Sequence, residues 1–410
     1  MTSLLSLPRE ARRSVLAWIV YDFANTCYSL IVITVFFTPY IKDVTGSNEP
    51  LGYATAASMV GAGLLVPFAG AISDRTNVTK RCLVGLTLVS CAATGALALP
   101  TGPGALVALF FVANLAYQLS LVFYNSLLGV VAGPDHVDQA NGWGVGVGYL
   151  GSLVALLAGI AAERLWGVRA TFALAALLFF AFSVPLFLFV RERAVPDALP
   201  VSRRLFAESI GRLARTLRDL PRTPALLLFL AGNFLAVDAL NTMIQFINET
   251  LRDYLGIAEP GPRYVTLVGL QVAAFPFGIL AGRLCRSRGG HFAYLAAIAS
   301  LLGALGACAI GTPRGLVLPA LVVCGGFGVG GIWVAGRRLV YDLAPRERLG
   351  EFFGLYGLTQ KTSATGALLF GVLTTRASHA YALALLAAYL VAGGALIALA
   401  RRRFERRPAG

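Results

Sequence analysis

Apolar stretches of roughly 18–25 residues recur along the whole chain, and short polar segments separate them. This is the length of an α-helix that crosses a bilayer, and it is too long for the strand of a membrane barrel. The pattern predicts an all-α membrane protein. We expect twelve transmembrane helices at 15–39, 52–73, 82–99, 104–130, 142–162, 169–190, 224–248, 264–282, 290–310, 315–336, 352–374 and 379–400.

The first apolar stretch carries a polar face. Asp22, Asn25, Thr26 and Ser29 are spaced i, i+3, i+4 and i+7, so a helix places them on one side. A carboxylate near the centre of a membrane helix costs roughly 2.5–3.5 kcal/mol on insertion scales. We therefore expect this face to look onto water or a protein partner and not onto lipid.

The same pattern returns in the second half of the chain. Asp238, Asn241 and Thr242 repeat the spacing of Asp22, Asn25 and Thr26. Repetition at a fixed offset indicates a duplicated unit. The predicted domains are an N-terminal six-helix bundle at 1–190, a cytoplasmic linker at 191–223, a C-terminal six-helix bundle at 224–400 and a basic tail at 401–410.

Composition agrees with a multi-pass membrane protein. Hydrophobic residues make up 57% of the 410 residues and charged residues only 13%, against about 25% charged in soluble domains. The net charge of +14 comes from Lys and Arg in the loops and tails, which indicates topology and not nucleic-acid binding. Its distribution predicts that both termini are cytoplasmic. We also expect the protein to reside in a bacterial cytoplasmic membrane.

The linker has the pattern of an amphipathic helix. Its apolar residues fall on one helical stripe and arginines occupy much of the rest. Ser202 can cap the start of this helix, and Pro221 ends it. We expect it to lie on the cytoplasmic leaflet, where membrane lipids are its partners.

Polar stripes mark two further spans. One stripe contains Asn114 and Gln118 in 104–130, and the other continues from Asp238 to Gln245 in 224–248. Lys361 lies inside 352–374, where a lone charge should pair with an acid or face a cavity. Acids inside a membrane can titrate, bind an amine or pair structurally. The candidate substrate- and proton-binding residues are Asp22, Asn25, Thr26, Asn114, Gln118, Asp238, Asn241, Thr242, Gln245 and Lys361.

Several motifs resemble a known family. Gly70-Ala-Ile-Ser-Asp74-Arg75, between the second and third spans, resembles the major facilitator superfamily. Tyr21-Asp-Phe-Ala-Asn-Thr26, Phe123-Tyr-Asn125 and Glu351-Phe-Phe-Gly-Leu-Tyr-Gly357 with Lys361 are similar to its vacuole-effluxer-like branch. The resemblance implies two pseudo-symmetric six-helix bundles and a cavity lined by the first, fourth, seventh and tenth spans. It also implies export, with amino acids the expected substrates.

The loop motif also predicts a conformational latch. A carboxylate at a helix end can hold a cation of the other half in one state and release it in another. The expected latch residues are Gly70, Asp74, Arg75, Arg81 and Arg337. The alternative for the basic residues is an orientation signal.

Other chemistry is not indicated. The six Cys and three His show no metal-ligand spacing, and no catalytic set is visible. We expect no enzyme, no metal and no cofactor. Glu249, near the outer end of its span, is expected to be an exposed rim charge, and His379 a surface residue.

These observations predict a secondary active transporter that works as a monomer. It would move a small polar solute by alternating access, coupled to protons, with export of an amino acid or related metabolite as the expected activity. Two alternatives stay open. One is a facilitative importer or uniporter of the same fold, and the other is a membrane sensor or partner protein that transports nothing.

Overall fold

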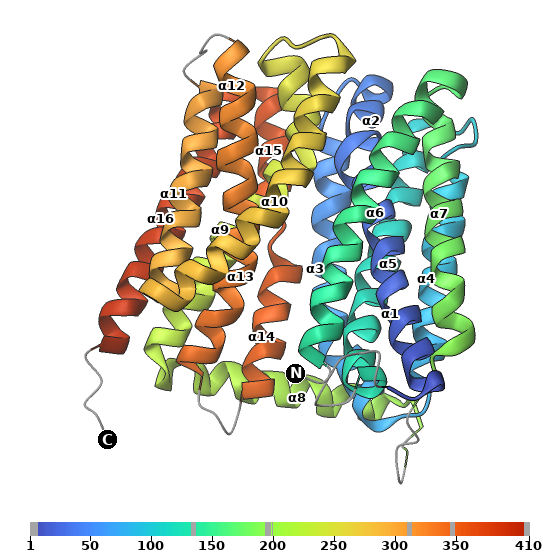
Figure 1. Cartoon of the computed structure of the whole chain (residues 1–410), viewed down its shortest axis with the longest axis vertical. Coiled ribbons are helices and arrows are strands. Elements are labelled where there is room, and N and C mark those ends of the chain that lie inside the picture. Colours follow the sequence, from blue (N-terminus) through green and yellow to red (C-terminus); the bar gives the residue numbers. More distant parts are fainter. Residues whose placement is uncertain are drawn as a thin grey trace. The chain divides into compact units, whose positions relative to one another are not determined.

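The computed structural model describes residues 7–132, 137–192, 198, 200–309, 314–344 and 349–405, which contain helices and no strand. Figure 1 shows the helices in the colours of the sequence. Contacts group the chain into two units. The first is Met1–Gly46 with Ala57–Leu213, and the second is Ser47–Ala56 with Ala214–Gly410. The boundary therefore falls inside the linker helix, and the start of α3 groups with the second unit.

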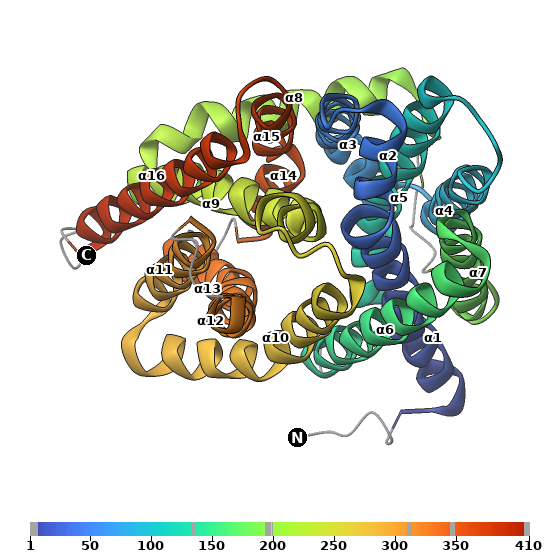
Figure 2. The same ribbon diagram turned by 90° about the horizontal axis from the view of Figure 1, so that it is seen from above.

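Within the first unit the helices follow the predicted spans. They are α1 (Arg9–Tyr28), α2 (Phe37–Thr45), α3 (Glu49–Arg75), α4 (Thr79–Ala96), α5 (Pro103–Ala132), α6 (Val137–Trp166) and α7 (Val168–Phe189). A π-helical segment, Ser29–Val35, joins α1 to α2, so Arg9–Thr45 forms one long helical stretch. Seen from above, α1, α6 and α7 lie side by side (Figure 2).

The linker contains the predicted amphipathic helix. It is α8 (Arg203–Asp219), followed by a 3-10 turn at Leu220–Arg222. Leu205 is buried, and the Phe206 ring meets the Phe68 ring of α3 edge-on at 5.3 Å. Arg75 at the end of α3 forms an ion pair of 2.9 Å with Glu208 of α8. The apolar stripe and one salt bridge thus hold the first part of α8 within the first unit.

The second unit repeats the plan with more irregular helices. They are α9 (Pro224–Glu249), α10 (Pro260–Arg288), α11 (Gly290–Ala309), α12 (Arg314–Ala320), α13 (Gly326–Leu343), α14 (Leu349–Thr362), α15 (Thr365–Arg376) and α16 (His379–Glu405). π-Helical segments follow α9 at Thr250–Tyr254 and join α12 to α13 at Leu321–Gly325.

The neighbours of each helix also repeat. In the first unit α1 packs on α7, and α4 packs on both α5 and α7. In the second unit α9 packs on α16, and α11 packs on both α13 and α16. The two units therefore share one packing scheme, which supports the duplication inferred from the Asp22 and Asp238 motifs.

Ten helical stretches in the described residues are long and apolar enough to cross a membrane. Two predicted spans are outside this set. The span at 82–99 is present as α4, but Lys80 and Arg81 in its first turn lower its hydropathy. The span at 352–374 is interrupted: α14 ends at Thr362 and α15 begins at Thr365. The chain is an integral, multi-pass membrane protein.

Candidate functional site

The Asp22 carboxylate lies against α6, where glycines leave room for it. A β-carbon on Gly148 would lie 3.1 Å from Asp22 Oδ2 and 3.3 Å from the Thr26 methyl group. A β-carbon on Gly151 would lie 2.6 Å from Thr26 Oγ1. Because larger side chains do not fit there, these glycines let α1 and α6 approach closely. Gly144, Gly148 and Gly151 of α6 thus form one wall of the Asp22 site.

Thr26 fastens the two helices beside Asp22. Its hydroxyl lies 2.9 Å from the carbonyl oxygen of Gly148 and 3.2 Å from that of Asp22, one turn earlier. A threonine hydroxyl that bonds the carbonyl four residues back is common inside helices. Here it also reaches the neighbouring helix, so it fixes the height of Asp22 along α6.

Aromatic residues of α5 form another side of the same site. The rings of Trp18 and Tyr124 stack at 4.4 Å, and Trp18 Nε1 donates to the Tyr124 carbonyl at 2.9 Å. The Tyr124 ring also stacks on that of Tyr21, the neighbour of Asp22, at 5.0 Å. Asp22 itself is only half-buried. A half-buried carboxylate among phenols and a glycine wall can exchange a proton or contact a cationic group.

The remaining polar candidate residues of the first unit differ in their hydrogen-bond partners. Asn114 donates to the Ser58 hydroxyl at 2.7 Å, and Gln118 is buried. Asn25 is 3% exposed, and neither atom of its amide has a hydrogen-bond partner among the described residues. An unpaired buried amide costs about 1–3 kcal/mol. Such an exception calls for an explanation, and ligand binding is one.

Asp238 occupies the corresponding place in the second unit, but its partners are different. It is fully buried, and it accepts hydrogen bonds from the Thr365 hydroxyl and from the Gly366 N–H at 3.0 Å. Gly366 and Thr365 open α15, whose own N-cap residue, Ala364, supplies no side-chain bond. The carboxylate of α9 therefore caps the start of a broken helix, where its charge also suits the helix dipole.

The other candidate residues on α9 lie along its length. Thr242 Oγ1 donates to the Asp238 carbonyl at 2.8 Å, as Thr26 does to Asp22. Gln245 donates to the Thr55 hydroxyl at 2.8 Å, and both residues are buried. Asn241 is half-buried. The Lys361 side chain lies outside the described part of the structure.

The expected latch residues are only partly described. The Asp74 side chain also lies outside the described part. Gly70 has open space where a side chain would be, and Arg75 pairs with Glu208 of α8. Arg81 lines a pocket at the start of α4, and Arg337 is exposed near the end of α13. The latch stays a prediction.

Sequence reasoning was wrong about Glu249, which is fully buried and is not an exposed rim charge. Asn48 Nδ2 donates to Glu249 Oε1 at 2.6 Å and to the Thr374 hydroxyl at 2.9 Å. His379 Nε2 lies 3.6 Å from Glu249 Oε1, and the His379 ring packs against Tyr254 and is largely covered.

These residues come from the segment just before α3 and from the ends of helices α9, α15 and α16. A position near the end of a span suggested an exposed charge, and only the folded chain shows what covers it. The single available signal was the pair of polar residues Asn48 and Glu249, each at the edge of an apolar stretch.

The sequence is similar to a family of membrane transporters and to two bacterial proteins. The family model of the Major Facilitator Superfamily matches residues 19–366. The chain is 28% identical over 379 residues to an uncharacterized MFS-type transporter, YxiO, of Bacillus subtilis (strain 168), with 87% of each chain covered. It is 23% identical over 370 residues to an uncharacterized protein of Aquifex aeolicus (strain VF5), with 88% of this chain and 89% of that one covered.

Solved structures share the fold. A crystal structure of the nucleoside transporter NupG matches with a TM-score of 0.71 at 14% identity, covering 96% of this chain and 100% of that one. A mutant of the peptide transporter POT matches with a TM-score of 0.69 at 16% identity, covering 98% and 97%. With a family match over most of its length, the chain belongs to the Major Facilitator Superfamily, whose members are membrane transporters and not enzymes.

Proposed function

We propose that the protein is a proton-coupled secondary transporter that exports a small polar solute, with amino acids or related metabolites as the substrate class. Asp22 is the expected proton-binding group. The observation that carries this role is its half-buried carboxylate, whose Oδ2 lies against Gly148 of α6 inside an apolar stretch long enough to span a membrane. An ionisable side chain inside a membrane span that stays partly accessible is suited to proton exchange.

Neutral polar side chains are the expected solute contacts within each unit. Asn25 supports this proposal because its amide is buried and unpaired within the described residues. An amide both donates and accepts, so it suits the ammonium or the carboxylate of an amino acid. Asn114 and Gln118, on α5, are the expected additional contacts, with Asn241 and Gln245 on α9.

The proposed topology has twelve crossings, with both termini in the cytoplasm of a bacterial cell. Besides the ten apolar stretches, α4 would supply one crossing and α14 with α15 the other. Discontinuous membrane helices are frequent at the binding sites of secondary transporters. The break beside Asp238 supports assigning α14 and α15 to one crossing.

The substrate class can be tested before flux is measured. Purified protein is screened by thermal shift against amino acids, dipeptides and nucleosides, the last two because the structural neighbours are described as peptide and nucleoside transporters. A solute that binds the folded state raises the melting temperature. Stabilisation by amino acids supports the proposal, and stabilisation by nucleosides alone contradicts the substrate class.

The coupling role is tested by Asp22→Asn in proteoliposomes. We expect pH-driven flux of the stabilising solute to fall to background, while counterflow without a pH gradient persists, because the amide binds solutes but no proton. The matched control is Asp43→Asn, a more exposed acid in the same helical stretch, which should transport normally. Unchanged flux in the Asp22 variant would remove this residue from the mechanism. If the wild-type flux is the same with and without a pH gradient, the protein is a uniporter.

A further inference from the structure

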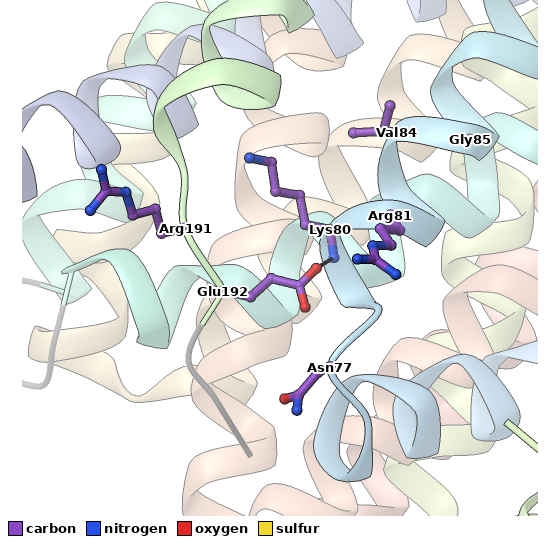
Figure 3. A pocket seen from close by; sticks show the side chains of 7 residues that line it. All are labelled: Asn77, Lys80, Arg81, Val84, Gly85, Arg191 and Glu192. Carbon is purple, nitrogen blue, oxygen red and sulfur yellow. Dashed lines mark hydrogen bonds between the residues drawn. The ribbon is translucent and has the colours of Figure 1, made fainter. Parts of the chain in front are cut away.

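A basic pocket lies where α4 begins and where the chain leaves α7. Its volume is about 640 Å³, and it is lined by Asn77, Lys80, Arg81, Val84, Gly85, Arg191 and Glu192. All seven residues belong to the first unit, and α4 and α7 are neighbours. Figure 3 shows the charged side chains and the hydrogen bond between Glu192 and the Lys80 backbone. This pocket has no part in the solute site described above.

The pocket contains three cationic side chains, Lys80, Arg81 and Arg191, and one carboxylate, that of Glu192. This carboxylate already has a hydrogen-bond donor. Glu192 accepts a hydrogen bond from the backbone N–H of Lys80, so it occupies the N-terminus of α4. Among the described residues, neither the Lys80 ammonium nor the Arg81 guanidinium forms an ion pair. Arg191 meets Glu10 only at 3.7 Å, with both side chains 85% exposed. Within the described part of the chain, the pocket thus offers Lys80 and Arg81 as cationic donors that form no ion pair, and an anion can bind to them.

Exposed apolar residues follow these cations along α4 and precede them along α7. Gly85 has no atom within 4 Å of where a β-carbon would lie, so the space over this part of α4 is free. One turn further along α4, Leu88 and Val89 are 43% and 47% exposed. On α7, Leu188 and Phe189 are 66% and 48% exposed, and buried Val190 separates them from Arg191. An apolar track therefore leads away from the cationic end along both helices.

The position of the pocket matches the boundary of a membrane. The apolar stretch of α7 ends at Phe189, and Arg191 and Glu192 follow at once. Lys80 and Arg81 stand in the first turn of α4. Basic pockets between membrane helices at this level recognise anionic lipid head groups. A ligand with a phosphate head and long apolar chains fits both parts of the surface, whereas a soluble anion fits only the cationic end.

We propose that this pocket binds the phosphodiester head group of an anionic glycerophospholipid, with its acyl chains along α4 and α7. Lys80, Arg81 and Arg191 contact the phosphate. Glu192 limits the affinity because its charge repels the phosphate, while its bond to the Lys80 N–H holds the segment after α7 against α4. Lipid binding at this site does not depend on solute transport, so it can be tested separately from the function proposed above.

The test uses native mass spectrometry of the full-length protein in detergent with equal amounts of phosphatidylglycerol and phosphatidylcholine. We expect wild-type protein to retain phosphatidylglycerol preferentially. Lys80→Gln/Arg81→Gln/Arg191→Gln should reduce this retention at least about tenfold, since each cation near a lipid surface contributes a severalfold effect. The matched control, Arg283→Gln/Arg286→Gln/Arg288→Gln, removes three exposed arginines at the end of α10 and should change it less than about twofold.

Two outcomes would overturn the proposal. Equal losses in both triple variants would show a general effect of net charge. Displacement of the lipid by millimolar inorganic phosphate would show that the site recognises a free anion. If the first triple variant does not fold, Glu192→Gln keeps the proposal testable. Its amide oxygen still accepts from Lys80 N–H, so retention of phosphatidylglycerol should rise, and a fall or no change would contradict the assigned role of Glu192.

Discussion

Asp22 and Asp238 stand in the same place of the two units, yet their surroundings differ. Each precedes a threonine by four residues, and each lies against a glycine on a neighbouring helix, Gly148 or Gly366. The helix facing Asp22, α6, is continuous, so its N–H groups are used internally. The helix facing Asp238 is broken, and the carboxylate accepts from its free end.

The difference shows how one duplicated motif can take two roles. A carboxylate that accepts hydrogen bonds from a helix terminus is tied to the fold. A carboxylate beside the middle of a continuous helix caps no helix terminus. We infer that the second copy became a structural cap, which leaves the first copy as the group suited to proton exchange.

The largest expected effect comes from removing the cap. Asp238→Ala leaves the buried Gly366 N–H without its acceptor and removes one partner of the Thr365 hydroxyl, which should cost about 3 kcal/mol of folding free energy. Asp22→Ala should cost about 1 kcal/mol, because no helix terminus depends on it. Thermal unfolding in detergent, followed by tryptophan fluorescence, measures both.

A second variant sharpens this result. Asp238→Asn keeps an oxygen acceptor for the N–H of α15, so it should recover most of the lost stability, down to a deficit of about 1 kcal/mol. Similar losses for the two alanine variants would contradict the assignment of different roles.

Adding a methyl group at each glycine gives an intermediate effect. A β-carbon on Gly366 would lie 2.6 Å from Thr242 Oγ1 and 3.0 Å from Asp238 Oδ1, so the cap must shift. Gly366→Ala should cost about 2 kcal/mol and Gly148→Ala, with looser contacts, less than about 1 kcal/mol. Gly357→Ala in α14 is the control, because nothing lies within 4 Å of its β-carbon position. A costlier change at Gly148 than at Gly366 would reverse the comparison.

The smallest effect concerns the helix ends after the second span of each unit. Arg75 pairs with Glu208, whereas the corresponding Arg283 is exposed. Arg204 and Arg75 lower the pKa of Glu208 below its usual 4.5. The pair therefore contributes above pH 4.5 and is lost as the pH falls through the lowered pKa.

Both partners of this pair are partly exposed, so the effect is screened. Glu208→Gln should shift the melting temperature by no more than about 1–2 °C at pH 7. The shift should vanish in strong acid. A shift that persists there would show that the carboxylate charge is not its cause.

Much of the fold could be predicted from the sequence, because a membrane span is marked by the length of its apolar stretch and a helical face by the spacing of its polar residues. The polar faces that begin at Asp22 and Asp238, and the helix at 202–221, follow directly from residue spacing. The break between α14 and α15 left no such signal, since Ser363 and Ala364 are ordinary helix residues. It depends on Asp238, 127 residues away from Thr365, and local pattern does not reveal so distant a partner.

The site was predicted less completely for a similar reason. The sequence places Asp22 and Asp238 on polar faces but does not say whether the opposing helix has free N–H groups. The burial of Glu249 likewise depends on Asn48, 201 residues earlier. Burial and pairing of charged groups arise from tertiary contacts, so only the three-dimensional structure shows that Asp238 caps the start of α15.

The grouping of Ser47–Ala56 with the second unit has a consequence for dissecting the protein. If the gene were divided within α8 and the halves produced separately, the C-terminal polypeptide would lack this segment. Glu249 would lose the amide of Asn48, Arg376 would lose the carboxylate of Glu49, and Gln245 would lose the hydroxyl of Thr55. A faithful half-molecule therefore has to carry these ten residues as an appended peptide, although they are encoded far upstream.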